Sequence, residues 1–204
     1  MRKAVFFLIL AFGTPPGIFA QRYSDSEVPR YELGLQFSFA HIERVSDALG
    51  GGASFHYNFN EHYALDSQFT YGPASASSIW AGGHATFLAG VRVGKRVEDY
   101  GFFLHARGGF MQYFAENGGQ PLFSRNTFPA FDVGGSLEHY FGMFPDPWRK
   151  NMVFRLEVGA LIVPYGRATL TPSSSPPIGS PPAPTGPPGT RVGPVLGLGI
   201  GFRF

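Results

Sequence analysis

The feature that most limits how this chain can fold is an alternation of apolar and polar residues that recurs in eight separate segments. In the first segment the alternate positions are apolar, namely Leu33, Leu35, Phe37 and Phe39. A repeat of two residues is typical of a β-strand with one apolar face. The other seven segments begin near residues 52, 63, 79, 102, 131, 152 and 196. The pattern therefore predicts an all-β protein.

Composition narrows the class of β-protein. Charged residues make up 15% of the chain, against about 25% in an ordinary soluble domain. Glycine is abundant, with 28 residues, aromatic residues reach 16%, and cysteine is absent. The sequence contains no apolar run long enough for a membrane-spanning helix, so the other architecture that a bilayer permits is a closed barrel. We expect an eight-stranded antiparallel up-and-down transmembrane β-barrel, held without disulfides.

The distribution of charge indicates which face of the strands meets lipid. Within the predicted strands, the apolar face carries no Asp, Glu, Lys or Arg, as expected where a charge at the bilayer midplane is costly. The opposite face carries five acids and five arginines, which can neutralise one another in a narrow lumen. They are Glu32, Asp66, Asp132, Glu138 and Glu157, and Arg92, Arg107, Arg155, Arg191 and Arg203. A soluble lipocalin-like binding barrel remains the alternative, since it also shows alternation.

Aromatic residues near the strand ends predict two girdles at the membrane interfaces. One rim would hold Tyr31, Tyr57, Phe59, Tyr63, Tyr100, Phe102, Trp148 and Phe204. The other would hold Phe39, Tyr71, Tyr113 and Tyr165. Three further aromatic residues, Trp80, Phe103 and Tyr140, fall on the inward face and predict a plugged lumen rather than a small diffusion channel.

The ends of the chain define its expected organisation. Residues 1–20 have two basic residues before an apolar run, then a Gly/Pro break and Ile18-Phe19-Ala20, which predicts a signal peptide cleaved after Ala20. Residues 21–30 would form a short periplasmic segment and residues 31–204 the barrel. With both ends in the periplasm, the short turns at Asn60-Glu61 and Gly94–Asp99 are periplasmic, and the connections after strands one, three, five and seven are the longer, extracellular ones.

Several segments resemble the OmpA-type outer-membrane β-barrel domains. They are the hairpin FHYNFNEHYALD, the glycine-containing strands FDVGGSLEHY and RLEVGALI, and the closing strand GLGIGFRF. The resemblance implies that the last strand, which ends in Phe204, is read by the barrel-assembly machinery. The periplasmic peptidoglycan-binding domain that some members carry is not expected, so a tether to the cell wall is not implied.

Residues 171–190 contain eight prolines and no charge, so they cannot pack as a core. The composition predicts an extracellular loop of disordered or polyproline-II character between the last two strands. A displayed segment of this kind could also bind an extracellular protein partner.

We find no residues to assign as catalytic, cofactor-binding or metal-binding. The six histidines lack metal-site spacing, and the basic residues form no patch for nucleic acid. The alternative of a lipid A-modifying outer-membrane enzyme depends on Ser67 and His139, which interrupt the apolar face on strands three and six, and those strands are not neighbours. We therefore expect a monomeric, non-enzymatic protein of a Gram-negative-type outer membrane, in contact with lipid and lipopolysaccharide, with a structural or adhesion-like role.

Overall fold

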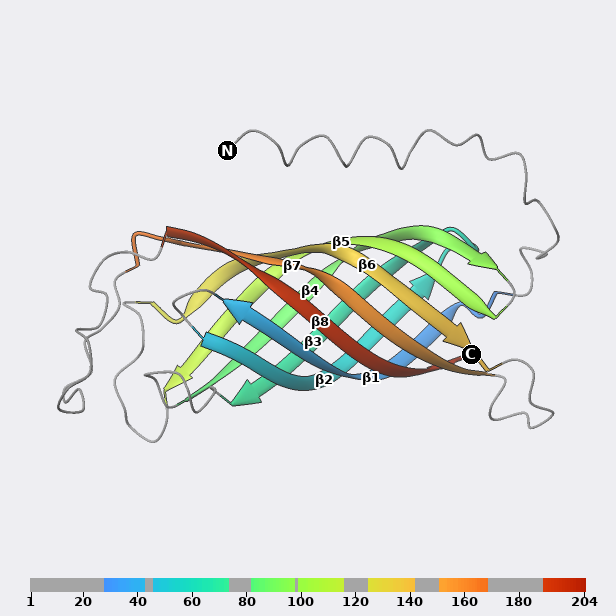
Figure 1. Cartoon of the computed structure of the whole chain (residues 1–204), viewed down its shortest axis with the longest axis horizontal. Coiled ribbons are helices and arrows are strands. Elements are labelled where there is room, and N and C mark those ends of the chain that lie inside the picture. The colour runs from blue at the N-terminus through green and yellow to red at the C-terminus, as the bar shows by residue number, and fades with distance from the viewer. Residues whose placement is uncertain are drawn as a thin grey trace.

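The chain forms a closed barrel of eight antiparallel strands, in which each strand pairs with its neighbours in sequence (Figure 1). The computed structural model describes residues 28–42, 46–73, 82–97, 99–115, 125–141, 151–168 and 189–204. The strands are β1 (Tyr31–Ile42), β2 (Ser46–Asn58), β3 (Tyr63–Pro73), β4 (Gly82–Val97), β5 (Tyr100–Ala115), β6 (Thr127–Tyr140), β7 (Met152–Gly166) and β8 (Gly189–Arg203). The expected eight-stranded antiparallel topology is confirmed. Among the described residues, no helix is long and apolar enough to cross a membrane.

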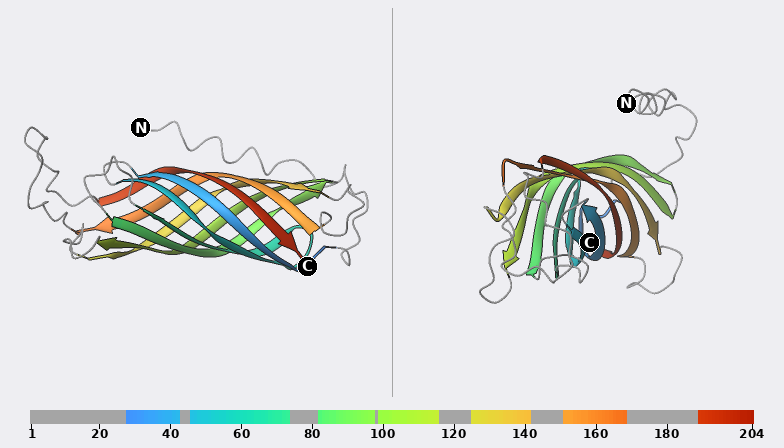
Figure 2. Two further views of the ribbon diagram at one scale, coloured as in Figure 1. Left: turned by 90° about the horizontal axis from the view of Figure 1, so that it is seen from below. Right: turned by 60° about the vertical axis from the view of Figure 1, so that its left-hand side comes forward.

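Pairing of the first and last strands closes the barrel. The register between β1 and β8 runs from Glu32 opposite Arg203 to Ala40 opposite Val195. At the end of this seam, the backbone amide of Tyr31 donates to the carbonyl of Phe204 (3.0 Å), and the amide of Phe204 donates back (2.9 Å). The strands run obliquely around the barrel (Figure 2), and their unbroken pairing leaves no free sheet edge.

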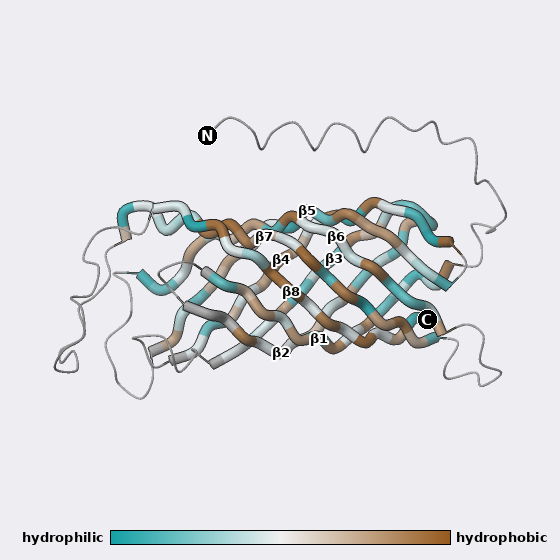
Figure 3. The backbone as a smooth tube through the Cα atoms, in the orientation of Figure 1, coloured by the Kyte–Doolittle hydropathy of each residue, from teal (hydrophilic) through white to brown (hydrophobic). Residues whose placement is uncertain are grey.

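The two faces of the strands differ sharply in polarity. Outward residues of β1 such as Leu35 and Phe37 are 72% and 68% exposed, whereas the inward Glu32 is fully buried. The same alternation of apolar and polar positions runs along the strands in Figure 3. The predicted inward and outward faces are thus confirmed, with the exceptions that follow.

β4 ends later than the sequence analysis expected. The chain turns between Val97 and Tyr100 rather than over Gly94–Asp99, so β4 keeps its alternation for three residues beyond Gly94. As a result, Lys95 lies on the exposed outward face and Arg96 is buried in the lumen. The prediction that the outward face carries no charge is therefore wrong at Lys95.

The aromatic girdle is confirmed at the end of the barrel where β1 begins and β8 ends. Tyr31 stacks on Phe204, with ring centroids 5.9 Å apart, and it packs at 5.3 Å from Tyr57. Other predicted rim residues there are exposed, namely Phe59, Tyr63, Tyr100 and Phe102. The Asn60-Glu61 turn also lies at this end, where Asn60 Oδ1 accepts from the amides of His62 and Tyr63, each at 2.8 Å.

At the opposite end the girdle prediction is half right. Phe39 and Tyr71 are exposed on the outward face, but Tyr113 and Tyr165 are buried inside the barrel. Tyr113 lies six positions from Arg107 on β5, and an even separation on a strand puts both side chains on the same face. Position at a strand end was thus a poorer guide than the alternation itself.

The connections between the strands differ in part from the prediction. Only residues 43–45 lie between β1 and β2, so the first of the supposedly longer connections is short. β2 begins at Ser46, earlier than predicted. Four predicted features lie outside the described residues, namely the signal segment, Trp80, Trp148 and positions 171–188 of the proline-rich loop. Gly189 and Thr190, which were assigned to that loop, are the first residues of β8.

Candidate functional site

The polar interior is the candidate functional site, and it is arranged in three levels along the barrel. The rim cluster lies nearest the end where β1 begins and consists of Glu32, Arg92, Arg96, Glu138 and Arg155. The central cluster consists of Asp66, His105, Arg107, Asp132 and Glu157. The aromatic layer lies towards the opposite end and consists of Tyr113, Phe128 and Tyr165. All of these side chains are buried.

Glu138 of β6 is the centre of the rim cluster. One of its oxygens accepts from Arg92 of β4 and from Arg155 of β7, whose Nη2 lies 2.6 Å away. Arg155 also donates to Glu32 of β1, so a single guanidinium joins two carboxylates. Arg96 donates to Asn58 Oδ1 (2.8 Å). Contacts between ionised partners are roughly twice as strong as neutral hydrogen bonds, so the rim cluster ties several strands across the lumen.

Two inward aromatic side chains fill the space around these arginines. The ring of Phe103 contacts both Arg92 and Arg96, whose guanidinium carbons are 4.6 Å and 4.8 Å from its centroid. The ring of Tyr140 lies 4.2 Å from the guanidinium carbon of Arg203. The negative face of an aromatic ring attracts a cation. The apparent irregularity of an apolar Phe103 among polar neighbours is therefore explained by the two cations that it contacts.

Arg107 of β5 is the centre of the central cluster. Its Nε donates to Asp132 Oδ2 (2.8 Å) and its Nη2 donates to Glu157 Oε2 (3.1 Å). Its Nη1 lies 3.5 Å from Asp66 Oδ2. The five donors of a guanidinium spread in a fixed fork, which suits contact with several carboxylates at once.

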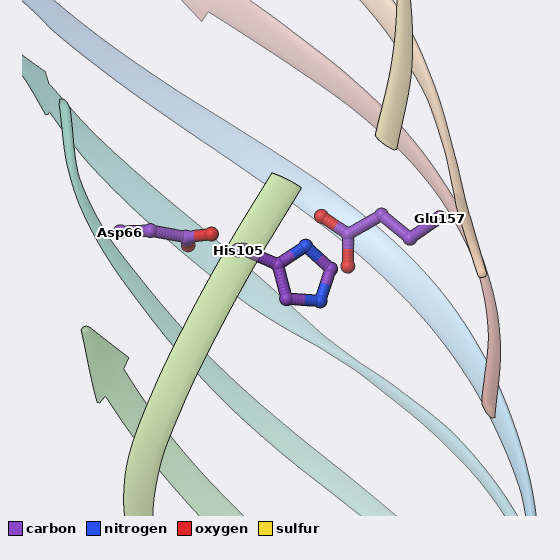
Figure 4. A group of neighbouring side chains, drawn as sticks. All are labelled: Asp66, His105 and Glu157. Atoms are coloured by element: carbon purple, nitrogen blue, oxygen red, sulfur yellow. The ribbon is translucent and has the colours of Figure 1, made fainter. Parts of the chain in front are cut away.

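Asp66, His105 and Glu157 also lie close enough together to be considered as a metal site (Figure 4). They come from β3, β5 and β7, and each offers one ligand atom within 4.8 Å of the others. The guanidinium of Arg107 contacts all three, with its Nη2 at 3.0 Å from His105 Nε2. A fixed cation already occupies the position that a metal ion would take, and a second positive charge there would be repelled. The arrangement therefore fits a structural arginine better than a metal centre.

The buried charges of the described residues balance. Five acids, Glu32, Asp66, Asp132, Glu138 and Glu157, lie with five arginines, Arg92, Arg96, Arg107, Arg155 and Arg203. The sequence predicted this balance and nine of the ten residues. Arg191 was the wrong member, because it is only half-buried and lies opposite Val163, beside the aromatic layer. Arg96 was missed because the turn was predicted to begin at Gly94.

The aromatic layer lies inside the barrel, beyond the central cluster. The hydroxyls of Tyr113 and Tyr165 are 2.6 Å apart and hydrogen-bonded, and Phe128 packs edge-on against Tyr165 at 4.8 Å. A cavity of about 30 Å³ lies beside Arg107 and is also lined by Met111 and Leu161. It has room for about one or two water molecules.

Ser67 and His139, on which the enzyme alternative depends, do not come together. Ser67 lies on β3 and His139 on β6, and each of these strands pairs only with its sequence neighbours. Ser67 Oγ donates to the carbonyl of Phe55 (3.2 Å), and the His139 ring packs against Tyr100 and Phe141, with centroids 4.9 Å away in both cases. A nucleophile and its base must lie within hydrogen-bond reach, which these two residues do not.

Comparison with known proteins relates the fold to solved structures. No family model matches the chain, and no curated protein matches its sequence. Neisserial surface protein A aligns with a TM-score of 0.51 and 13% identity over 85% of this chain and 96% of its own. The N-terminal barrel of Pseudomonas aeruginosa OprF aligns with a TM-score of 0.44 and 12% identity, over 84% and 97% of the two chains. Ail, the attachment invasion locus protein of Yersinia pestis, aligns with a TM-score of 0.42 and 15% identity, over 85% of this chain and 96% of its own. The chain thus shares its fold with Neisserial surface protein A.

Proposed function

We propose that this barrel spans the outer membrane of a Gram-negative-type bacterium as an OmpA-like protein with a plugged lumen and a structural or surface-interaction role. The observation that carries the proposal is the inverted distribution of polarity. Five acidic side chains and five arginines are buried inside, while the outward faces of the strands are covered by large apolar residues such as Leu35, Phe37 and Leu104. Soluble monomers rarely expose a continuous apolar surface of this extent, whereas a bilayer requires it.

The same arrangement disfavours a soluble lipocalin-like barrel. In such a barrel the apolar side chains fill the interior and the polar ones meet water. Here the interior holds Glu138, Arg155 and Arg107, while the large apolar side chains point outward, which is the reverse of what a soluble barrel requires.

The membrane assignment is tested by folding the chain after removal of residues 1–20. We expect sheet-dominated circular dichroism in detergent, and a band that migrates differently on a gel before and after boiling. A chain that gives the same spectrum and a monodisperse monomer in water without detergent would overturn the assignment.

The packing of the lumen supports a plugged barrel rather than a small diffusion channel. Two ionic clusters and the aromatic layer follow one another along the axis, and the cavity beside Arg107 has a volume of only about 30 Å³. Planar-bilayer recordings of the refolded protein test this point. We expect no steady ion-sized conductance, and regular open-channel currents from a pure, folded preparation would favour the channel instead.

The surface-interaction role concerns the proline-rich segment between β7 and β8. At its base, Gly166 and Gly189 pair with each other and both have positive φ values of 63° and 65°, a conformation that glycine adopts without strain. A loop deletion should therefore keep Gly166 and Gly189 and remove residues 171–188. Unchanged assembly with lost binding to host cells or phage would support an extracellular protein partner, and unchanged binding would refute one.

We propose that the signal peptide is cleaved after Ala20 and that the barrel-assembly machinery recognises the last strand and Phe204. We also propose that the folded barrel is a monomer without enzymatic activity and that it contacts lipopolysaccharide. Phe204 is exposed beside Tyr31 at the end of the seam, which leaves it accessible to a recognition factor. An unchanged lipid A profile on overexpression is expected. A new lipid A species that depends on Ser67 or His139 would instead support the enzyme alternative.

A further inference from the structure

Three arginines lie at the end of the barrel opposite Phe204, on neighbouring strands (Figure 1). Arg125 precedes β6, Arg167 follows β7, and Arg191 is the third residue of β8. Arg191 is half-buried and lies opposite the buried Val163, so it faces the lumen. The other two arginines are exposed. They place two positive charges on the outside of this end of the barrel.

No acid balances these arginines within their own part of the sequence. Residues 117–131 and 158–202 contain all three arginines but no Asp or Glu. The acids that border these stretches are Glu116, which lies outside the described residues, and Asp132 and Glu157. The last two are buried in the central cluster, where an arginine already binds them. A local excess of positive charge of this kind attracts an anionic partner.

A tight turn at the end of β7 brings the two exposed arginines together. The amide of Ala168 donates to the carbonyl of Tyr165 (3.2 Å) and closes a four-residue turn, in which Gly166 has a positive φ of 63°. Arg125 Nη2 donates to the same carbonyl (3.3 Å). Since Arg167 lies inside this turn, both arginines are tied to one point of the backbone.

The guanidinium of Arg125 is also held by an aromatic ring. Its carbon lies 4.8 Å from the centroid of the Phe128 ring, which is a cation–π contact. The ring and the Tyr165 carbonyl fix the side chain, yet it remains exposed. A side chain that is already fixed loses less freedom on binding a ligand. The fork of donors on a guanidinium matches the oxygens of a phosphate group.

The apolar surface next to these arginines points to a lipid rather than a soluble anion. Val192 of β8 and Phe131 of β6 are 58% and 48% exposed on the outward face. Both residues lie within four positions of the end of the strand nearest the arginines. The arginines therefore lie where the apolar belt gives way to water, which is the level of lipid headgroups.

We propose that Arg125 and Arg167 together bind one phosphate group of lipopolysaccharide. The phosphate oxygens accept from the exposed guanidinium groups, while the acyl chains lie against the apolar outward face of β6 to β8. Each arginine beside an anionic headgroup favours binding by about fivefold, so the pair favours it by about 25-fold. The site specifies the lipopolysaccharide contact proposed above and rests on the proposed membrane location, with this end of the barrel outside the cell.

Native mass spectrometry of the refolded, delipidated barrel tests the site. The protein in detergent is mixed with equimolar lipid A and dephosphorylated lipid A that carry identical acyl chains, and the lipid retained on release from detergent is identified. We expect the phosphorylated form to be favoured about 25-fold. Arg125→Gln or Arg167→Gln should each lower this ratio to about five, and the double variant should lower it to about one. Added salt should weaken the preference, because both side chains are exposed.

Arg30→Gln is the matched control, since it removes an exposed cation at the opposite end of the barrel and should leave the ratio unchanged. Every variant first passes the gel-mobility test of folding. A wild-type chain that does not fold in detergent contradicts the membrane location itself.

Two results would overturn the phosphate site alone. One is a folded wild type that shows no preference for phosphorylated lipid A. The other is an Arg125→Gln, Arg167→Gln double variant that keeps the preference. A parallel sample contains dextran sulfate as a soluble polyanion. If dextran sulfate displaces lipid A from the wild type and binds in its place, the lipid assignment is also overturned, because the arginines would then bind an extracellular polymer.

Discussion

Replacement of Arg107 by methionine removes the cation of the central cluster while keeping a side chain of similar length. Arg107 is buried and lies between Asp132, Glu157 and Asp66, at 2.8, 3.1 and 3.5 Å. Its loss leaves three carboxylates in the lumen without their principal partner. Removing one member of a buried ionic group costs about 3–5 kcal/mol, because the remaining charge is uncompensated. We expect Arg107→Met to lower the free energy of unfolding by that amount.

Two further measurements separate this electrostatic cause from a packing defect. Adding Asp132→Asn to Arg107→Met should restore part of the lost stability, because one uncompensated charge is removed. Zn²⁺ should also stabilise Arg107→Met but not the wild type, because Asp66, His105 and Glu157 have ligand atoms within 4.8 Å of one another once the guanidinium is gone. Chelation should reverse the effect.

The assay is reversible urea unfolding of the refolded barrel in lipid vesicles, followed by the gel-mobility difference and by tryptophan fluorescence. Arg30→Gln is the control for loss of an exposed charge, and it should change the free energy of unfolding by less than about 0.5 kcal/mol. If Arg107→Met changes stability as little as Arg30→Gln does, the assignment of Arg107 as the cation of the cluster is refuted.

Three other changes test the packing of the lumen by the same unfolding assay. Phe103→Ala should cost about 3–5 kcal/mol and Phe103→Leu clearly less, because the first leaves a cavity beside Arg92 and Arg96; equal losses would refute a role for the ring. Gly52→Ala should prevent folding, since its Cβ would lie 1.8 Å from the Phe69 carbonyl, whereas Gly51→Ala, with its nearest contact at 3.6 Å, should fold. Tyr165→Phe should cost about 1 kcal/mol by removing the hydrogen bond to Tyr113; an unchanged stability would show that this bond contributes nothing.

The sequence predicted correctly whether most side chains point into the lumen or outward. Side chains on a strand alternate between these two faces, and the apolar and polar residues of the chain follow that alternation closely. Lys95 and Arg96 were misplaced through one error, the assumption that Gly94 begins a turn. A glycine inside a strand also marks a close backbone approach, and here a Cβ at Gly94 would lie 1.9 Å from the Phe102 carbonyl. The alternation of Val91, Val93 and Val97 was the signal that could have extended the strand.

The sequence could not predict which arginine meets which acid. Arg155 and Glu32 are 123 residues apart, and they meet only because β1 pairs with β8 and β8 with β7. Which residues meet across the lumen depends on the stagger between neighbouring strands, which accumulates around the barrel. The residue pattern within a single strand does not reveal that stagger.

The reach of the arginines across the lumen bears on how the barrel assembles. Arg155 of β7 joins Glu32 of β1, Arg92 of β4 joins Glu138 of β6, and Arg107 of β5 contacts Asp66 of β3. In an incomplete barrel, or one with a strand shifted by two residues, apolar side chains would still face outward but these charges would lose their partners. The ionic interior therefore disfavours misaligned strand pairings that the apolar exterior tolerates, and it couples closure of the barrel to the correct register of the other strands.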